Sequence, residues 1–255
     1  MPNRMKQALL KIFTHSHIHS FTIKNMFQFK QFTIHQDQCA MKVSTDACIL
    51  GAWVDVAQAE NILDIGAGTG LLSLMMAQRS TACIDAVELD TPAFEQAKSN
   101  IAESKWSDRI EVFHGKIQKF SPDKKYDYIV SNPPFYQNHL KSEKVQKNQA
   151  HHTETLSFEE LLDSVLRLRT TSGKFAVLLP AYEAKVLEDL AVSKGFFLQK
   201  KLIVRHREGA KILRVIVEYG TASVVLENTE LLIKDAQEQY TAQFSALLKE
   251  YYLIF

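Results

Sequence analysis

The stretch Ile62-Leu63-Asp64-Ile65-Gly66-Ala67-Gly68-Thr69-Gly70 predicts a buried strand, a glycine-rich turn and the beginning of a helix. Glycines let a backbone approach a ligand closely, and a helix N-terminus offers free N–H groups, so this arrangement suits a nucleotide-like cofactor. A dinucleotide fingerprint would place its third glycine where Leu71 stands. A phosphate loop would need Gly-Lys-Ser or Gly-Lys-Thr, which the stretch lacks.

Strands and helices alternate outward from this turn. Strands are expected at residues 27–34 (as a strand or hairpin), 61–65, 82–89, 110–114, 126–131 and 173–179, and as an antiparallel pair at 196–204 and 212–219. Helices are expected at 47–53, capped by Thr45 or Asp46, and at 71–79, 92–104, 158–168, 181–194 and 235–251. Ser157 and Glu160 predict a capping box for the helix at 158–168. The alternation predicts an α/β fold whose mostly parallel sheet is covered on both faces.

The composition is that of a globular protein with one large core, since 46% of the 255 residues are hydrophobic, 23% are charged and the net charge is +1. No apolar run approaches the roughly 20 residues needed to cross a bilayer. Cys39, Cys48 and Cys83 are scattered without a CxxC pair, which argues against a disulfide framework or a zinc site and fits the reducing cytoplasm. Residues 1–25 are basic without any acid, so we expect a flexible tail before a single domain at 26–255.

The segment Asn132-Pro133-Pro134-Phe135 predicts a stiff turn after the strand at 126–131, because two prolines end a strand. The Asn132 side-chain oxygen and the Pro133 carbonyl are acceptors that could bind both N–H bonds of a planar amine and favour its nucleophilic form. Phe135 offers a stacking face worth ~1–3 kcal/mol for a nucleobase. The structural alternative is a rigid turn with a core phenylalanine.

An acid, Glu88, ends the second strand, where it can accept hydrogen bonds from ribose hydroxyls. Together, Asp64, the three glycines and Glu88 resemble the S-adenosylmethionine site of class I methyltransferases. The resemblance implies a Rossmann-like fold, with seven strands of which the last is antiparallel, and a small N-terminal addition. It also implies S-adenosylmethionine as cofactor, bound by Asp64, Gly66, Gly68, Gly70, Glu88 and Asn132.

The turn Asn132 to Phe135 resembles the signature of methyltransferases that act on amino groups of adenine, guanine or glutamine. With residues 27–34, 42–53 and 150–161, the chain resembles the bacterial tRNA1(Val) adenine-37 N6-methyltransferase family over about 26–219. This implies methyl transfer to N6 of adenine 37 in the anticodon loop, with tRNA as partner. We expect a monomer that needs neither membrane nor metal.

The same resemblance extends the expected site. Its catalytic residues would be Asn132, Pro133, Pro134 and Phe135, and Lys42 and Thr45 would join the cofactor contacts. The local basic charge after the turn and near the C-terminal strands predicts RNA contacts, namely Lys141, Lys144, Lys147, His152, Arg205 and Arg207. For any single one of these side chains, a solvated surface position is the alternative. Two positions depart from the family pattern: Lys116 stands where an acid would contact the cofactor adenine, and His151 stands where Arg is expected.

Other interpretations remain open from the residues alone. The turn chemistry is shared by methyltransferases of ribosomal or DNA bases and of a glutamine in a translation factor. The glutamine enzymes usually carry Tyr in place of Phe135 and a separate N-terminal helical domain. A cofactor-binding but inactive RNA module is a further alternative, and Leu71 argues against a nicotinamide-dependent dehydrogenase.

Overall fold

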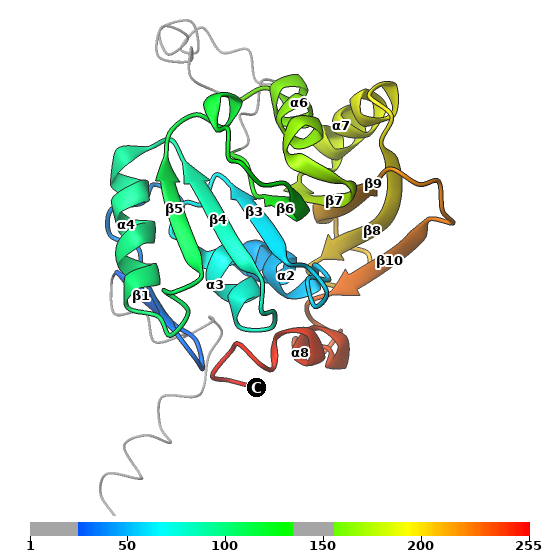
Figure 1. Cartoon of the computed structure of the whole chain (residues 1–255). Helices are drawn as coiled ribbons and strands as arrows, with labels where there is room; N and C mark the ends of the chain where they lie inside the picture. Colours follow the sequence, from blue (N-terminus) through cyan, green and yellow to red (C-terminus); the bar gives the residue numbers. More distant parts are fainter. Residues whose placement is uncertain (1–24, 135–155) are drawn as a thin grey trace, which may run out of the picture.

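The computed structural model describes residues 25–134 and 156–255, built around an eight-stranded sheet with helices on both faces (Figure 1). The expected basic tail falls almost wholly in residues 1–24, outside the described part. The elements are β1 (Met26–Gln28), β2 (Thr33–His35), α2 (Thr45–Trp53), β3 (Asn61–Ile65), α3 (Leu71–Ala77), β4 (Cys83–Glu88), α4 (Thr91–Ala102), β5 (Ile110–His114), η1 (Ile117–Lys119), β6 (Tyr126–Ser131), α6 (Phe158–Leu168), β7 (Arg169–Leu179), α7 (Ala181–Ser193), β8 (Phe197–Arg205), β9 (Ile212–Gly220), β10 (Glu227–Leu232) and α8 (Ala242–Leu248).

The strand order in the sheet is β10-β8-β9-β7-β6-β3-β4-β5. All neighbours are parallel except β9, which runs antiparallel to both β7 and β8. The seven strands expected from the sequence, with β9 as the antiparallel last one, are therefore present. An eighth strand, β10, adds to the edge beside β8. It escaped prediction because four of its six residues are polar and exposed.

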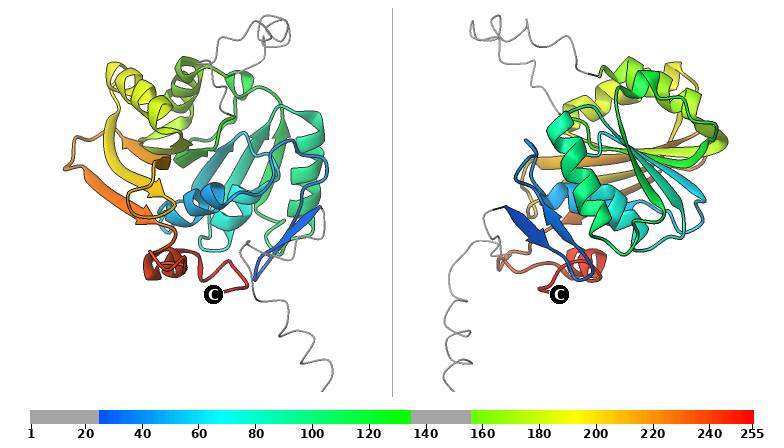
Figure 2. Two further views of the ribbon diagram at one scale, coloured as in Figure 1. Left: turned by 180° about the vertical axis from the view of Figure 1, so that it is seen from behind. Right: turned by 60° about the vertical axis from the view of Figure 1, so that its left-hand side comes forward.

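Each face of the sheet has its own hydrophobic core. One core lies under α2, α3 and α8, and the other lies under η1, α6 and α7. Strand β3 serves both, since Ile62 belongs to the first core while Leu63 and Ile65 belong to the second. Two turned views show helices on either side of the twisted sheet (Figure 2). Burial on both faces explains why these strands read as continuous apolar runs.

The β1–β2 hairpin packs against the C-terminal end of the chain. The Phe29 and Phe32 rings stack with centroids 4.5 Å apart, and Phe29 lies 6.0 Å from Tyr252. The Lys30 backbone N–H donates to the Tyr251 carbonyl at 2.8 Å. Figure 2 shows the hairpin beside the red C-terminal segment. Aromatic packing thus fixes the hairpin on the body of the molecule.

Several helix boundaries differ from the expected ones by one or two residues, and the final helix differs most. The final helix was expected at 235–251 but covers only Ala242–Leu248, after the cap Thr241. The Asp235 carboxylate accepts from the Gln237 and Gln239 N–H groups, and Glu238 has a left-handed φ of 58°, so this segment closes a turn instead.

The N-cap of α2 is Ser44, not the expected Thr45 or Asp46, because Ser44 has an extended backbone and the helix begins at Thr45. Asp46 lies in the first turn, and its side chain and that of Ser44 both accept from the Ala47 N–H. The predicted capping box of α6 is confirmed at Ser157 and Glu160.

Truncating Phe29 to Ala should lower the free energy of unfolding by about 3–5 kcal/mol, because a ring that is 2% exposed leaves a cavity between the hairpin and Tyr252. Urea unfolding followed by circular dichroism measures this. As a control, Val225→Ala removes methyl groups from a side chain that is 95% exposed and should change stability by less than about 0.5 kcal/mol. Equal effects of the two substitutions would contradict this account of the packing.

Candidate active site

Three parallel strands bring the predicted site residues to one edge of the sheet. In the register of these strands, Ile65 of β3 lies opposite Val87 of β4 and Ser131 of β6. The next residue along each strand is Gly66, Glu88 or Asn132. Because the strands are parallel, these residues meet at the carboxyl edge, where open α/β sheets bind ligands.

The glycine-rich turn joins β3 to α3. Gly66, Gly68 and Gly70 have φ values of 76°, 56° and 79°, a left-handed conformation that favours glycine. A Cβ atom on Gly66 or Gly68 would meet nothing within 4 Å, so open space faces these positions. On Gly70 it would lie 3.4 Å from Ile101 Cδ1 and 3.6 Å from Ala97 Cα of α4. The first two glycines thus leave room for a ligand, and Gly70 lets α4 pack closely.

The Glu88 carboxylate is held against this turn. Its Oε2 accepts from the Gly68 N–H at 2.8 Å, and its Oε1 accepts from the Asp90 N–H at 2.8 Å. Two backbone donors therefore set the direction of the carboxylate at the mouth of the turn. A carboxylate oxygen has further lone pairs, so Glu88 can still accept from ligand hydroxyl groups.

Asp64 lies beneath the turn and is fully buried. Its Oδ2 accepts from the Ser73 hydroxyl at 2.7 Å, whereas Oδ1 is buried and finds no hydrogen-bond partner within the described part of the chain. Burial raises the pKa of Asp64 to about 7 against the opposing hydrogen bond from Ser73, and the charge of Glu88 raises it further. An unsatisfied buried acceptor at a ligand site fits a donor supplied by the ligand.

The turn after β6 presents a second unsatisfied acceptor. The Ser131 hydroxyl donates to the Ile65 carbonyl at 2.8 Å and joins the end of β6 to β3. The Asn132 Nδ2 group lies 3.8 Å from Met41 Sδ, while Asn132 Oδ1 is buried and has no hydrogen-bond partner among the residues that the structure describes. Pro133 is buried and Pro134 is exposed. The amide is thus oriented with its donor side toward Met41 and its acceptor side available.

Of the other predicted cofactor contacts, Lys42 lies on the segment that leads into α2, and Thr45 is the first residue of that helix. The Lys42 ammonium group donates to the Gln36 carbonyl. The Thr45 side chain hydrogen-bonds Tyr252, whose pKa is raised mainly by burial. Both residues have partners within the chain, and their cofactor role stays a prediction.

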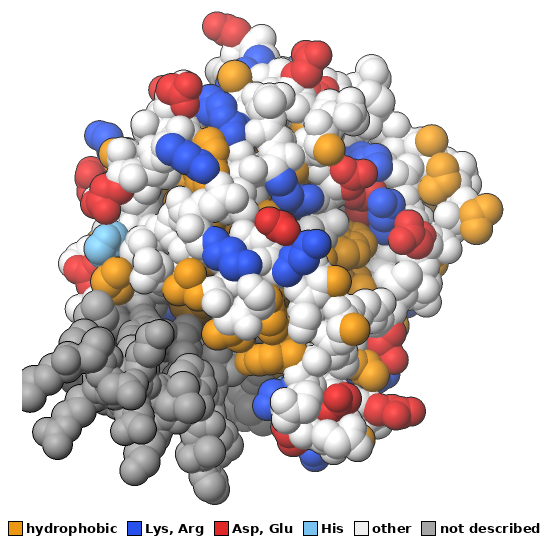
Figure 3. Space-filling view, turned by 90° about the horizontal axis from the view of Figure 1, so that it is seen from below, with side chains coloured by type: hydrophobic (Ala, Val, Ile, Leu, Met, Phe, Trp, Pro, Cys, Tyr) orange, Lys and Arg blue, Asp and Glu red, His pale blue; other side chains and the backbone are white. Residues whose placement is uncertain are grey.

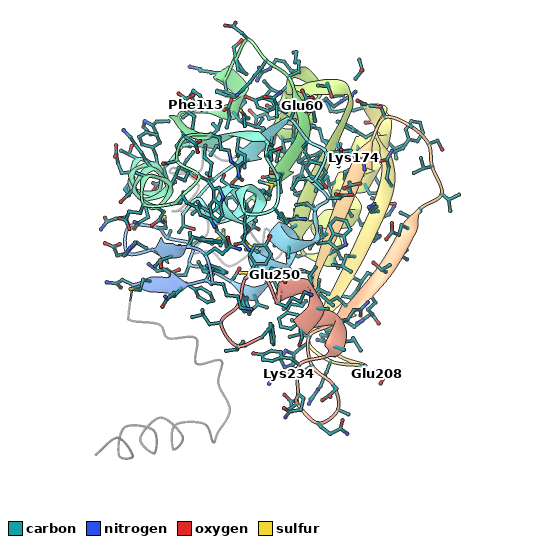
Figure 4. All side chains as sticks on the ribbon, turned by 60° about the horizontal axis from the view of Figure 1, so that its bottom comes forward. Glu60, Phe113, Lys174, Glu208, Lys234 and Glu250 are labelled. Atoms are coloured by element: carbon teal, nitrogen blue, oxygen red, sulfur yellow. The ribbon has the colours of Figure 1, made fainter. Side chains whose placement is uncertain are left out.

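The predicted RNA contacts that the structure describes are engaged in ion pairs. Arg205 Nε lies 2.6 Å from Glu230 Oε1, and Arg207 Nη1 lies 2.9 Å from Glu238 Oε1. The neighbouring residues Glu208 and Lys234 lie near each other below α8 in Figure 4. The face seen from below also mixes Lys and Arg with Asp and Glu (Figure 3), so it presents no field of a single sign. An RNA role for the two arginines remains a prediction.

Several predicted residues lie outside the described part of the chain. These are Phe135, Lys141, Lys144, Lys147, His151 and His152. Lys116, the departure after β5, lies near the start of α6. Its charge helps to lower the pKa of Glu160, which is lowered chiefly by hydrogen bonds to Ser157.

Residues missed by the sequence reading support the site from α4. Asn100 is 1% exposed and Gln96 is 6% exposed, and both bond to segments far away in sequence. The sequence does hold a sign of this role, because the spacing of Gln96 and Asn100 places them on the same helix face as the buried residues Ala93, Ala97 and Ile101. A polar residue on an apolar helix face needs a partner, and this could have marked both positions.

Neither a metal site nor a membrane-spanning helix is found among the described residues. Within residues 25–134 and 156–255, no group of three or more His, Cys, Asp or Glu side chains is placed to hold a metal ion. No helix in these ranges has both the length and the apolar character needed to cross a bilayer.

Known proteins resemble this chain in sequence and in fold. A family model described as Methyltransferase small domain matches residues 39–156. A Dyadobacter fermentans protein named tRNA1(Val) (adenine(37)-N6)-methyltransferase is 48% identical over 234 residues, covering 90% of this chain and 98% of that protein. A Trichodesmium erythraeum protein of the same name is 45% identical with the same coverage. A predicted O-methyltransferase from Agrobacterium tumefaciens has a TM-score of 0.64 at 18% identity, covering 80% of this chain and 96% of that one. This match confirms the expected Rossmann-like methyltransferase fold.

Asp64 should make stability depend on pH. Its folded pKa is about 7 and its ordinary value is 3.8, so between these values the folded protein keeps a proton that the unfolded chain releases. The free energy of unfolding should therefore fall as pH rises through this window, by up to about 1 kcal/mol per pH unit, and level off above the folded pKa. Urea unfolding of the wild type and of Asp64→Asn, at pH values across the window, measures this. The stability difference between the two proteins should change with pH, and a constant difference would contradict the assignment.

Proposed function

We propose that this chain, which belongs to the tRNA1(Val) (adenine(37)-N6)-methyltransferase family, transfers a methyl group from S-adenosylmethionine to N6 of adenine 37 in the anticodon loop of tRNA1(Val). The family resemblance seen in the sequence is confirmed by the two relatives. The observation that carries the proposal is the buried Oδ1 of Asn132, which no described residue bonds and which lies at the same sheet edge as the glycine-rich turn.

The residues of the cofactor side fit S-adenosylmethionine. The cofactor, when bound, supplies an electrophilic methyl group on a sulfonium. The unpartnered Asp64 Oδ1 suits its α-ammonium group, and Glu88 suits its ribose hydroxyls. The open space at Gly66 and Gly68 leaves room for it against the backbone. Lys42 and Thr45 remain proposed additional contacts.

The chemistry at the target amine follows from Asn132 and Pro133. The lone pair of an adenine amino group is delocalised into the ring, so the amine is a poor nucleophile. We assign the Asn132 Oδ1 atom and the Pro133 carbonyl as acceptors for its two N–H bonds. They favour the tetrahedral nitrogen and stabilise the positive charge that develops on it. No general base is required, because the proton can leave afterwards.

RNA binding completes the proposal. The adenine must leave its stack to reach Asn132, and Phe135 would then stack on it. Lys141, Lys144, Lys147, His152, Arg205 and Arg207 are proposed phosphate contacts, with salt-dependent affinity. Because one chain supplies the glycine-rich turn, Glu88 and Asn132, we propose a monomer that acts on tRNA in the cytoplasm. The mechanism uses no metal ion.

Asn132→Ala should lower kcat about 10²–10³-fold, because it removes an acceptor used in the transition state, while cofactor binding stays near wild type. The assay follows N6-methyladenosine in a tRNA1(Val) transcript by nucleoside mass spectrometry. Asn132→Asp keeps an acceptor oxygen and should retain more activity than Asn132→Ala. Unchanged kcat in the alanine variant would refute this mechanism. A transcript with guanine at position 37 should gain no methyl group, and methylation of it would show that another base is the target.

Glu88→Ala should weaken binding of S-adenosylhomocysteine about ten- to a hundredfold, because two ribose hydroxyls lose their acceptor. Isothermal titration calorimetry measures the dissociation constant. Glu88→Gln keeps one acceptor oxygen and should fall between the wild type and Glu88→Ala. If both variants bind as tightly as the wild type, Glu88 does not contact the cofactor.

A further inference from the structure

We propose that Asn100 is a positioning residue that fixes the segment between β2 and α2, residues 36–44, against the cofactor turn. We call residues 36–44 the connecting segment. The inference rests on the proposed function, since it assigns a supporting role at the same site. It adds a residue on α4 that touches neither the proposed cofactor contacts Asp64 and Glu88 nor Asn132.

Asn100 uses its whole amide group to join two separate parts of the chain. Its Oδ1 accepts from the His35 N–H at 2.9 Å, and its Nδ2 donates to the His35 carbonyl at 2.8 Å. The same Nδ2 donates to the Thr69 carbonyl at 2.9 Å, within the glycine-rich turn. The side chain is 1% exposed, so water cannot replace these bonds. One side chain thus ties the end of β2 to the turn.

The same face of α4 supports both parts by further contacts. Gln96 Oε1 accepts from the Gln38 N–H at 3.1 Å, one helical turn before Asn100. Ala97 and Ile101 pack where Gly70 lacks a side chain. The position of α4 therefore sets the position of the turn and of the connecting segment together.

The connecting segment runs from α4 toward both halves of the active site. Burial raises the pKa of the Cys39 thiol to about 11, and the charge of Glu88 is the next largest cause, so Cys39 lies near that carboxylate. Two residues further on, Met41 Sδ lies 3.8 Å from Asn132 Nδ2. The Val43 N–H donates to Gln36 Oε1 at 2.8 Å, which closes the segment on itself.

Fixing the connecting segment therefore matters most at the cofactor half of the site. If Asn100 no longer holds β2 against Thr69, the turn and the segment can shift relative to each other. Gly68 and Glu88, which contact each other, would no longer be pre-organised for a ligand. We expect cofactor affinity to fall more than methyl transfer at saturating cofactor, because Asn132 keeps its place at the end of β6.

The test uses Asn100→Asp in the full chain. The aspartate has the same shape and can still accept from the His35 N–H, but its second oxygen faces the His35 and Thr69 carbonyls. Two acceptors then oppose a carboxylate, so the tie becomes repulsive. Titration calorimetry with S-adenosylhomocysteine as the probe should show binding weaker by about tenfold or more. The KM for the cofactor should rise in parallel, with a smaller change in kcat.

Asn228→Asp is the matched control, because it makes the same chemical change on an exposed residue of the edge strand β10. It should bind the probe like the wild type. Should Asn100→Asp fail to fold, Gln96→Leu removes only the bond to the Gln38 N–H and should still weaken binding several-fold.

Hydrogen exchange separates positioning from a merely structural role. In the wild type, the probe should slow amide exchange in residues 36–44, and Asn100→Asp should lose this protection. A folded Asn100→Asp that binds the probe with wild-type affinity and keeps the protection would overturn the inference alone. Failure of the wild type to bind the probe would overturn the proposed function and the inference with it.

Discussion

The register of β3 with its two parallel neighbours is the constraint on which the site depends. Pairing of Ile65 with Val87 and Ser131 places Gly66, Glu88 and Asn132 at one edge, although they are far apart in sequence. A shift of one residue in either pairing would turn the side chains to the opposite face and separate the three residues. The apolar runs of the strands, buried on both faces, hold this register.

Features with a local signature could be predicted from the sequence, whereas features made by distant contacts could not. The glycine-rich turn, Glu88 and the Asn132-Pro133-Pro134 turn each consist of residue types with a particular backbone conformation or chemistry, at a fixed distance in sequence from a predicted strand. The bonds of Asn100 to His35 and Thr69 span 65 and 31 positions, and no short pattern encodes them. Strand β10 has little apolar content, and Asp235 turns a segment whose composition suited a helix. At β10 the pairing with β8 outweighed the low strand propensity, whereas at Asp235 local side-chain bonds to the Gln237 and Gln239 N–H groups outweighed helix propensity.

Two buried acceptors, Asp64 Oδ1 and Asn132 Oδ1, have no partner in residues 25–134 and 156–255, and they lie on the two sides of the proposed methyl-transfer site. Leaving a buried acceptor unsatisfied costs about 1–3 kcal/mol, so each lowers the stability of the free protein. The rest of the site compensates, since Ser73, Ser131 and the backbone of Gly68 and Asp90 satisfy the neighbouring groups. The free protein therefore loses stability at the two acceptors that, in the proposed function, accept hydrogen bonds from the cofactor and the adenine.

The contact between the β1–β2 hairpin and the C-terminal segment also sets an order of events during synthesis. Lys30 bonds to the carbonyl of Phe255, 225 positions later, and the rings of Phe29 and Tyr252 pack together. These contacts cannot form until the ribosome has made both partners, and pairings this distant in sequence are slow to close. The hairpin, and the connecting segment that follows it, can therefore reach their final places only after Tyr252 and Phe255 have been synthesised. A nascent chain would carry the glycine-rich turn long before it carried a complete cofactor site.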